Sequence, residues 1–285
     1  MPAHFPVDLD AVRGRHPQHF QRFDRRRQTV IALAAAAFAL LVFAMDQLDF
    51  FDGKLLKGMG RLVEIIGLML PPDPKDWAHV RIFSSALLET IAISLLGTLM
   101  AAVLALPLAF LAARNITAQR VVRFLSRRSL DTIRSVDILV WALIWVNVVG
   151  LGPFAGALAI MTADIGTFGK LFSEAIEAAD RKPVEGIVST GGGQLLGVRF
   201  GIIPEVFPVL ASQVLYFFES NTRSASIIGI VGAGGIGLYL AEAIRTLELQ
   251  QTSFIIFMIL VSVALIDYVS GQLRFAVIGR RGVVA

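Results

Sequence analysis

Long apolar runs, separated by short polar and basic stretches, form the pattern of this chain. A helix needs about 20 apolar residues to cross the hydrocarbon core of a bilayer, and several of these runs reach that length. The pattern predicts an all-α membrane protein with about six transmembrane helices. The expected spans cover residues 29–46, 83–112, 135–150, 153–172, 203–222 and 252–270.

A shorter segment after the first span has a different pattern. Within residues 54–70, apolar side chains recur at helical spacing on one face and charged side chains occupy the other. This predicts a helix lying at the outer membrane interface, ended by Pro71, Pro72 and Pro74 and followed by Trp77 as an interfacial anchor. A spacer helix packed on the bundle is at least as good an interpretation as a docking role, so the role of this segment stays open.

Composition agrees with a membrane protein, because 55% of the 285 residues are hydrophobic and the mean hydropathy is +0.70. The chain has no cysteine, which excludes structural disulfides and thiolate metal sites. Its net charge of +4 comes from basic residues at the ends of apolar runs, which indicates membrane topology and not a nucleic-acid partner. These basic clusters fall on one side of the membrane, so both termini are expected to be cytoplasmic.

The pattern of apolar runs and basic clusters divides the chain into four parts. Residues 1–28 form a basic cytoplasmic tail, and residues 29–82 hold the first span and the outer helix. Residues 83–275 form the membrane core, and residues 276–285 a short cytoplasmic tail.

A glycine-rich polar stretch between two apolar runs, near residues 183–204, predicts a cytosolic elbow. Pro183 suits the first turn of a helix, which continues until Gly191, Gly192 and Gly193 interrupt it. Residues 194–200 then form a second arm, and Pro204 starts the next membrane helix. An ordered loop of this kind is typical of a surface that a partner grips.

This stretch resembles the EAA loop of ABC-importer permeases, whose pattern is Glu-Ala-Ala, three residues, Gly, nine residues and Ile-x-Leu-Pro. Glu185, Gly191 and Pro204 stand in the same register as that pattern. The resemblance implies that the elbow, with Glu185, Gly186, Gly191, Gly192 and Pro204, couples the protein to an ATPase. The chain departs from the pattern at four positions: Gly186, Ile187, Gly201 and Ile203.

Further similarity extends over residues 89–278 and includes ETIAISLLGTLMAAVLALPLAFLAARN, GLGPFAGALA, FFESNTRSASIIGIVGAGGIG and EAIR. These segments resemble the permease subunit of phosphonate ABC transporters. The resemblance implies a type I importer fold (MetI-like), a homodimer in a bacterial inner membrane, two copies of an ATPase subunit and a periplasmic phosphonate-binding protein. The chain itself has no G-x-x-x-x-G-K-[ST] phosphate loop, so we expect ATP to bind only the partner subunit and no cofactor to bind this chain.

A polar run near the outer end of the fifth expected span offers two interpretations. Glu219, Asn221, Thr222, Arg223 and Ser224 could line the route of an oxyanion, with Arg223 as its cation. Alternatively, Glu219 and Arg223 form an ion pair at i, i+4 spacing that stabilises the helix end. Both interpretations stay open and they are compatible.

A second glycine-rich stretch matches G-x-G-x-x-G by letter, through Gly232, Gly234 and Gly237. A membrane span precedes it and the acidic residue of a dinucleotide site is missing, so we reject that function. Together with Gly235, these glycines predict a break or a re-entrant turn. The resemblance implies that they lie in the permease core near the outer gate.

No pattern of catalytic residues is visible, and we predict neither a metal site nor covalent catalysis. The four histidines, His4, His16, His19 and His79, have no metal-ligand spacing with carboxylates. One alternative is an ion-coupled secondary transporter of a small anion, with Glu89 or Asp164 as proton carrier, but it leaves the elbow unexplained. Another is a membrane enzyme acting on phosphorylated lipids, which lacks the required cluster of His, Asp or Ser. We interpret the intramembrane polar residues as structural, namely Glu89, Asp137, Asn147, Asp164 and Asp267.

Overall fold

The computed structural model describes residues 25–48, 50, 54–117 and 119–278, and within these residues every regular element is helical. This confirms the predicted all-α class. Most of the expected N-terminal tail and the end of the C-terminal tail lie outside the described residues. The chain forms two units, residues 1–67 and 68–285.

The first unit contains α3 (Arg25–Gln47) and most of α4 (Lys54–Met69). Residues 28–47 of α3 are apolar enough to cross a membrane and their apolar stretch is not buried, as expected for a helix that meets lipid. The predicted helix at 54–70 is confirmed as α4, whose described apolar side chains such as Leu62 and Val63 are exposed. Its position at the outer interface stays a prediction.

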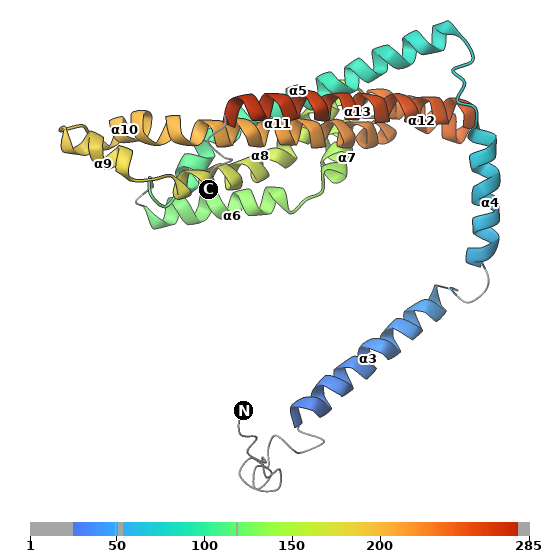
Figure 1. Cartoon of the computed structure of the whole chain (residues 1–285), viewed down its shortest axis with the longest axis horizontal. Helices are drawn as coiled ribbons and strands as arrows, with labels where there is room; N and C mark the ends of the chain where they lie inside the picture. Colours follow the sequence, from blue (N-terminus) through green and yellow to red (C-terminus); the bar gives the residue numbers. More distant parts are fainter. Residues whose placement is uncertain (1–24, 49, 51–53, 118, 279–285) are drawn as a thin grey trace, which may run out of the picture. The chain divides into compact units, whose positions relative to one another are not determined.

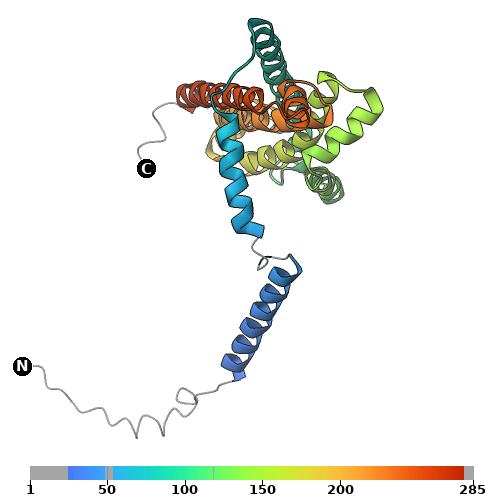
Figure 2. The same cartoon turned by 90° about the vertical axis from the view of Figure 1, so that its right-hand side faces the viewer.

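The second unit is a helical bundle whose centre is α8 (Figure 1). Helix α8 packs against α5, α6, α7 and α11, while α7 and α13 lie on opposite sides of the bundle in both views (Figures 1 and 2). The helices of this unit are α5 (Trp77–Ala112), α6 (Arg120–Arg134), α7 (Ile138–Val149), α8 (Pro153–Ala178), α9 (Lys182–Ser189), α10 (Gln194–Gly197), α11 (Ile203–Ile228), α12 (Ile236–Arg245) and α13 (Leu249–Ile278).

Small side chains bring α5 and α8 close together. Ala101, Ala105 and Ala109 are fully buried on one face of α5. At Gly97, an added Cβ would lie 2.7 Å from the Cβ of Ile160, so only glycine fits the observed approach of the two backbones. Small residues at such an interface allow the close packing that holds membrane helices together, since apolar side chains gain little by leaving lipid.

Helix α5 begins where the proline-rich segment ends. Asp76 is its N-cap, and its carboxylate accepts hydrogen bonds from the backbone N–H of His79 at 2.9 Å and pairs with the His79 ring at 2.8 Å. These bonds lower the pKa of Asp76 below its ordinary value. Trp77, the predicted interfacial anchor, is the first residue of the helix and is 87% exposed.

Within the described residues, four helical stretches are long and apolar enough to cross a membrane, or five if the pair α6 and α7, bent by 87°, counts as one span. This differs from the expected six at two places. The span expected at 135–150 is α7, whose 12 residues reach only about 18 Å. The span expected at 153–172 is α8, which carries Asp164 and Lys170 and is surrounded by other helices, so it does not need an apolar surface on every side.

Candidate functional site

The predicted elbow is present and lies at one end of the bundle, where α9 and α10 extend beyond the other helices (Figure 1). Pro183 occupies the first turn of α9, as predicted. Before it, Asp180 accepts a hydrogen bond from the N–H of Lys182 at 3.1 Å, and Glu205 accepts one from the N–H of Asp180 at 2.7 Å. The first turn of α11 therefore holds the start of the elbow.

The glycine bend has the geometry of a helix C-cap. Gly191 has φ +89°, and its N–H donates to Val188 O at 2.9 Å, while the N–H of Gly192 donates to Ile187 O at 3.0 Å. An added Cβ at Gly192 would lie 2.7 Å from the Cγ2 of Ile187. The backbone angle thus requires glycine at position 191, and the lack of room for a side chain requires it at position 192. The predicted bend is confirmed.

The second arm differs from the prediction of a separate helix before Pro204. Residues 194–231 form one helical run, in which a π-helical turn (Val198–Ile202) joins α10 to α11. Pro204 lacks an N–H and its ring clashes with the carbonyl four residues earlier in a regular α-helix. The wider turn, closed by the bond from Ile203 N to Val198 O, accommodates this proline without ending the helix.

The two arms of the elbow meet through one apolar side chain. An added Cβ at Gly197 would lie 3.0 Å from the Cγ1 of Val184, and one at Gly201 would lie 3.0 Å from its Cγ2. Gly201 is one of the positions where the chain departs from the EAA pattern. Its lack of a side chain leaves the space that Val184 fills.

The outer surface of the elbow is open. Glu185 and Gly186 are exposed, and nothing lies within 4 Å of a Cβ added at Gly186. Beside them Val188 is 51% exposed, Leu195 85% and Phe200 60%. This combination of a carboxylate and large exposed apolar side chains, outside the region expected to meet lipid, is typical of a surface that binds another protein.

A polar clamp near the elbow was missed by the sequence analysis. Glu177 at the end of α8 accepts hydrogen bonds from the N–H of Arg114 at 2.6 Å and from the guanidinium of Arg127. Arg127 Nε also donates to Ala112 O at 2.9 Å. The clamp joins the ends of α5 and α8 to α6. These arginines were interpreted only as topology signals, and no local pattern identifies their partner.

The polar run predicted for an oxyanion route contains two side chains that face the bundle interior. Asn221 Nδ2 donates to Thr98 Oγ1 at 2.8 Å and to Asp164 Oδ2 at 2.5 Å. Thr222 Oγ1 lies 3.1 Å from Ser94 Oγ. Asn221 and Thr222 are only 4% and 1% exposed, so in this structure they connect α11 to α5 and α8.

The predicted ion pair of Glu219 and Arg223 is present, with 3.1 Å between Oε1 and Nη1. Arg274 of α13, which was not foreseen, lies 3.2 Å from the other oxygen of Glu219. The Glu219 side chain is 9% exposed and that of Arg223 is 49% exposed. The run lies inside α11 and not at its end, because the helix continues beyond Ser224 to Ile228.

The predicted break at the second glycine stretch is also present. A 3-10 turn (Gly229–Val231) ends α11, and Gly232, Gly234 and Gly235 follow with φ of +92°, +81° and +76°. Gly237 lies in α12, where an added Cβ would be 2.0 Å from Ser226 O. The glycines thus let α12 turn back closely against α11; their role as a gate stays a prediction.

Side chains of α5 hold this glycine loop, residues 232–235. Glu89 Oε1 accepts from Gly235 N at 2.9 Å and Thr90 Oγ1 accepts from Ile236 N at 2.8 Å. These acceptors satisfy free N–H groups at the start of α12. A cavity of about 310 Å³ lies beside the loop and is lined by Glu89 and Leu151, among others.

For metal binding, the part of the chain that the structure describes holds no group of three or more His, Asp or Glu side chains suited to a metal ion. Three of the four histidines lie outside that part, and His79 pairs with Asp76.

Comparison with known proteins gives one family and a set of related permeases. Residues 105–280 match the family described as binding-protein-dependent transport system inner membrane component. The chain is 36% identical to the putative phosphite transport system permease protein HtxC of Stutzerimonas stutzeri, over 89% of each chain. It is 33% identical to the phosphite transport system permease protein PtxC of the same organism, over 96% of this chain and 98% of the relative.

A shorter relative and a solved structure extend the comparison. The chain is 49% identical to the putative cryptic phosphonate transport system permease protein PhnE2 of Escherichia coli strain K12, over 41% of this chain and 96% of the relative. Its fold matches that of an inward-facing MetNI methionine ABC transporter with a TM-score of 0.62 at 17% identity, over 71% of this chain and 99% of the other. The expected MetI-like fold is therefore confirmed.

The buried amide of Asn221 gives a prediction for stability. Replacing Asn221 with Leu leaves Asp164 buried without its donor, so we expect the free energy of unfolding to fall by about 1–3 kcal/mol. The double variant Asn221→Leu/Asp164→Leu should regain part of this loss, because neither polar group then lacks a partner. Thermal unfolding of the purified protein in detergent measures both.

A matched control is Asn147→Leu, since Asn147 is exposed and donates to Leu143 O of its own helix. Equal unfolding temperatures for Asn147→Leu and Asn221→Leu would contradict the assigned network.

Proposed function

The chain belongs to the family of binding-protein-dependent transport system inner membrane components, and from this premise we propose that it is the permease subunit of an ATP-binding-cassette importer for a phosphonate or a related phosphorus oxyanion such as phosphite. The chain is a multi-pass membrane protein with a transport role. The main support for this class of ligand is the similarity, along almost the whole chain, to permeases named for phosphite transport. The 49% identity to a permease named for phosphonate transport supports it.

The energy for transport enters through the elbow. The chain has no phosphate-binding loop of its own, so ATP is hydrolysed on a separate ATPase subunit. The exposed side chains of Glu185, Val188 and Leu195 form the surface on which that subunit docks. A second copy of the chain completes the pathway, and each copy binds one ATPase subunit.

The continuous helix of residues 194–231 supplies the mechanical connection. Because no loop separates the second arm of the elbow from α11, displacement of the elbow moves α11 as a lever. The other end of this helix is the glycine loop, held by Glu89 and Thr90. Closure of the ATPase pair therefore moves the elbow and the glycine loop together. This movement opens the pathway in turn to the two sides of the membrane.

The basic residues set the orientation of the chain. Arg114, Arg120 and Arg127 lie at the elbow end of the bundle, which is therefore cytoplasmic together with both termini. The opposite end faces the periplasm of a bacterium, where a phosphonate-binding protein delivers the anion. That protein selects the ligand, so the pathway needs only modest affinity.

The alternative of an ion-coupled secondary transporter has less support. It requires a carboxylate that is free to exchange protons, yet Asp164 is hydrogen-bonded to Asn221 and Glu89 to the glycine loop. It also gives the elbow no role.

Reconstitution tests the proposal. The protein is placed in liposomes with its ATPase subunit and binding protein, and uptake of labelled phosphite or methylphosphonate is measured. We expect uptake that requires ATP and the binding protein. Accumulation by the chain alone, driven by an ion gradient, would overturn the proposal.

The glycine bend provides a prediction for coupling. Val at position 191 must adopt φ near +89°, whereas Gly193 has φ −74°, so Gly191→Val should strain the bend and Gly193→Val should not. We expect Gly191→Val to insert normally but to lose most of the ligand-stimulated ATPase activity of the complex. Normal stimulation in Gly191→Val, measured beside Gly193→Val, would show that the bend does not transmit the signal.

The oxyanion route can be tested at Arg223. In Arg223→Ala, Glu219 keeps Arg274 as its partner, so we expect the complex to assemble while uptake falls severalfold. Arg128→Ala is a suitable control, because Arg128 is exposed and its guanidinium makes a loose ion pair of 3.8 Å with Asp131 and lies over the Phe124 ring. If Arg223→Ala transports like the unmodified protein, Arg223 serves only the ion pair.

A further inference from the structure

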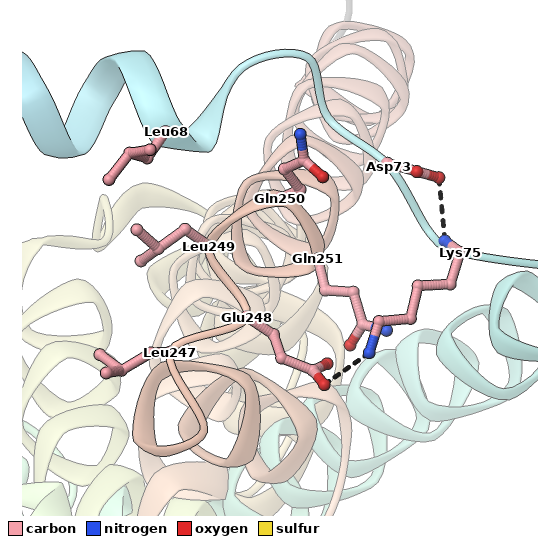
Figure 3. Close-up of a pocket in the computed structure, with 8 residues that line it drawn as sticks. All are labelled: Leu68, Asp73, Lys75, Leu247, Glu248, Leu249, Gln250 and Gln251. Carbon is pink, nitrogen blue, oxygen red and sulfur yellow. Dashed lines mark hydrogen bonds and ion pairs between the residues drawn. The ribbon is translucent and has the colours of Figure 1, made fainter.

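A pocket of about 400 Å³, drawn in Figure 3, lies at the end of the bundle opposite the elbow. One wall is the segment that leads into α5, and the other is the turn between α12 and α13. Its volume falls within the range of about 300–1,000 Å³ found for small-molecule sites. None of the roles assigned above uses it.

Two hydrogen bonds fix the two walls to each other. The N–H of Asp73 donates to Gln250 O at 3.3 Å, and the hydroxyl of Ser253 donates to Met69 O at 2.6 Å. The carboxylate of Asp73 accepts from the N–H of Lys75 at 2.9 Å, as Figure 3 shows. Asp73 is thus engaged by its own segment and by α13.

One ion pair crosses the pocket. Lys75 Nζ lies 2.5 Å from Glu248 Oε1, and the two side chains are 52% and 35% exposed, so both are accessible from water (Figure 3). Lys75 and Leu247 have φ of +69° and +58°, which residues other than glycine rarely adopt. Such backbone strain on both walls of one pocket is typical of a functional site.

The pocket also borders an unpaired hydrogen-bond donor. Gln251 is 6% exposed, and its Nε2 has no hydrogen-bond partner among the described residues. A second cavity of about 280 Å³ shares Lys75, Glu248 and Gln251 with the first and adds His79. A buried donor without an acceptor raises the free energy of the protein. A ligand that brings an acceptor to this amide removes that cost and is favoured for this reason.

We propose that this pocket is an outer waiting site for the phosphorus oxyanion, which binds there before it enters the pathway. Lys75 leaves Glu248 and binds one oxygen of the anion, and the amide of Gln251 donates to another. Glu248 competes for Lys75 and keeps the affinity modest, which allows the anion to move on. The proposal rests on the proposed function, because that function supplies the ligand and makes this end of the bundle the outer one.

Binding to the full chain tests the site without its partners. The protein is purified in detergent free of phospholipid, and calorimetry measures the affinity for phosphite, methylphosphonate and inorganic phosphate. We expect Lys75→Met to weaken binding about tenfold or more and Gln251→Leu to weaken it severalfold, as for the loss of a charge-assisted and a neutral hydrogen bond. Gln250→Leu is the matched control, since Gln250 is exposed and its side chain points away from the ion pair in Figure 3.

Glu248→Gln provides an independent test, because here we expect anion binding to become stronger and not weaker. It frees Lys75 from its competitor, so the affinity for the three anions should rise severalfold. Unchanged affinity in Lys75→Met, Gln251→Leu and Glu248→Gln would overturn the site. A short-chain phosphatidylglycerol is added as a further arm, and binding of this headgroup without binding of the free anions would also overturn it.

The two proposals fail in different ways. If the reconstituted complex takes up phosphite with ATP but the purified chain binds no anion, only the waiting site is wrong. If the complex takes up no phosphorus oxyanion, the proposed function is wrong.

Discussion

The close approach of α5 and α8 is the constraint on which the rest of the structure depends. Gly97 and the buried alanines bring the two backbones together, and this contact places Thr98 of α5 and Asp164 of α8 within reach of Asn221 on α11. A larger residue at Gly97 would separate the helices and leave these polar groups buried without partners. The apolar packing and the polar network therefore require each other.

The second organising feature is the continuity of the helical run from the elbow to the glycine loop. The π-helical turn accepts Pro204, and Val184 closes the elbow against Gly197 and Gly201. Glu205 on α11 holds the start of the elbow, and the Glu177 clamp ties the end of α8 just before it to α5 and α6. A force on the elbow thus acts on a braced helix, since each end of that helix is tied to other elements.

Features with a local cause were predictable from the sequence. The bend at Gly191 and the break at Gly232 follow from what glycine allows, and the start of α9 follows from Pro183 in its first turn. Features that depend on residues far apart in the chain were not predictable from the sequence. The Arg274 contact to Glu219 joins positions 55 residues apart. The polar α8 is compatible with a membrane because α5, α6, α7 and α11 pack around it. The second arm was predicted as separate because Pro204 usually starts a helix, whereas in the structure a π-helical turn accommodates this proline within one helical run.

The start of α12 depends on distant residues, and this limits which segments can be exchanged between homologues. Its N-cap is Gly235, which has no side chain to accept a hydrogen bond, and the acceptors are Glu89 and Thr90, 146 residues earlier in the chain. The stability of this short helix is therefore encoded in another part of the gene. A chimera that grafts residues 229–245 from a homologue is compatible only when positions 89 and 90 are transplanted with them.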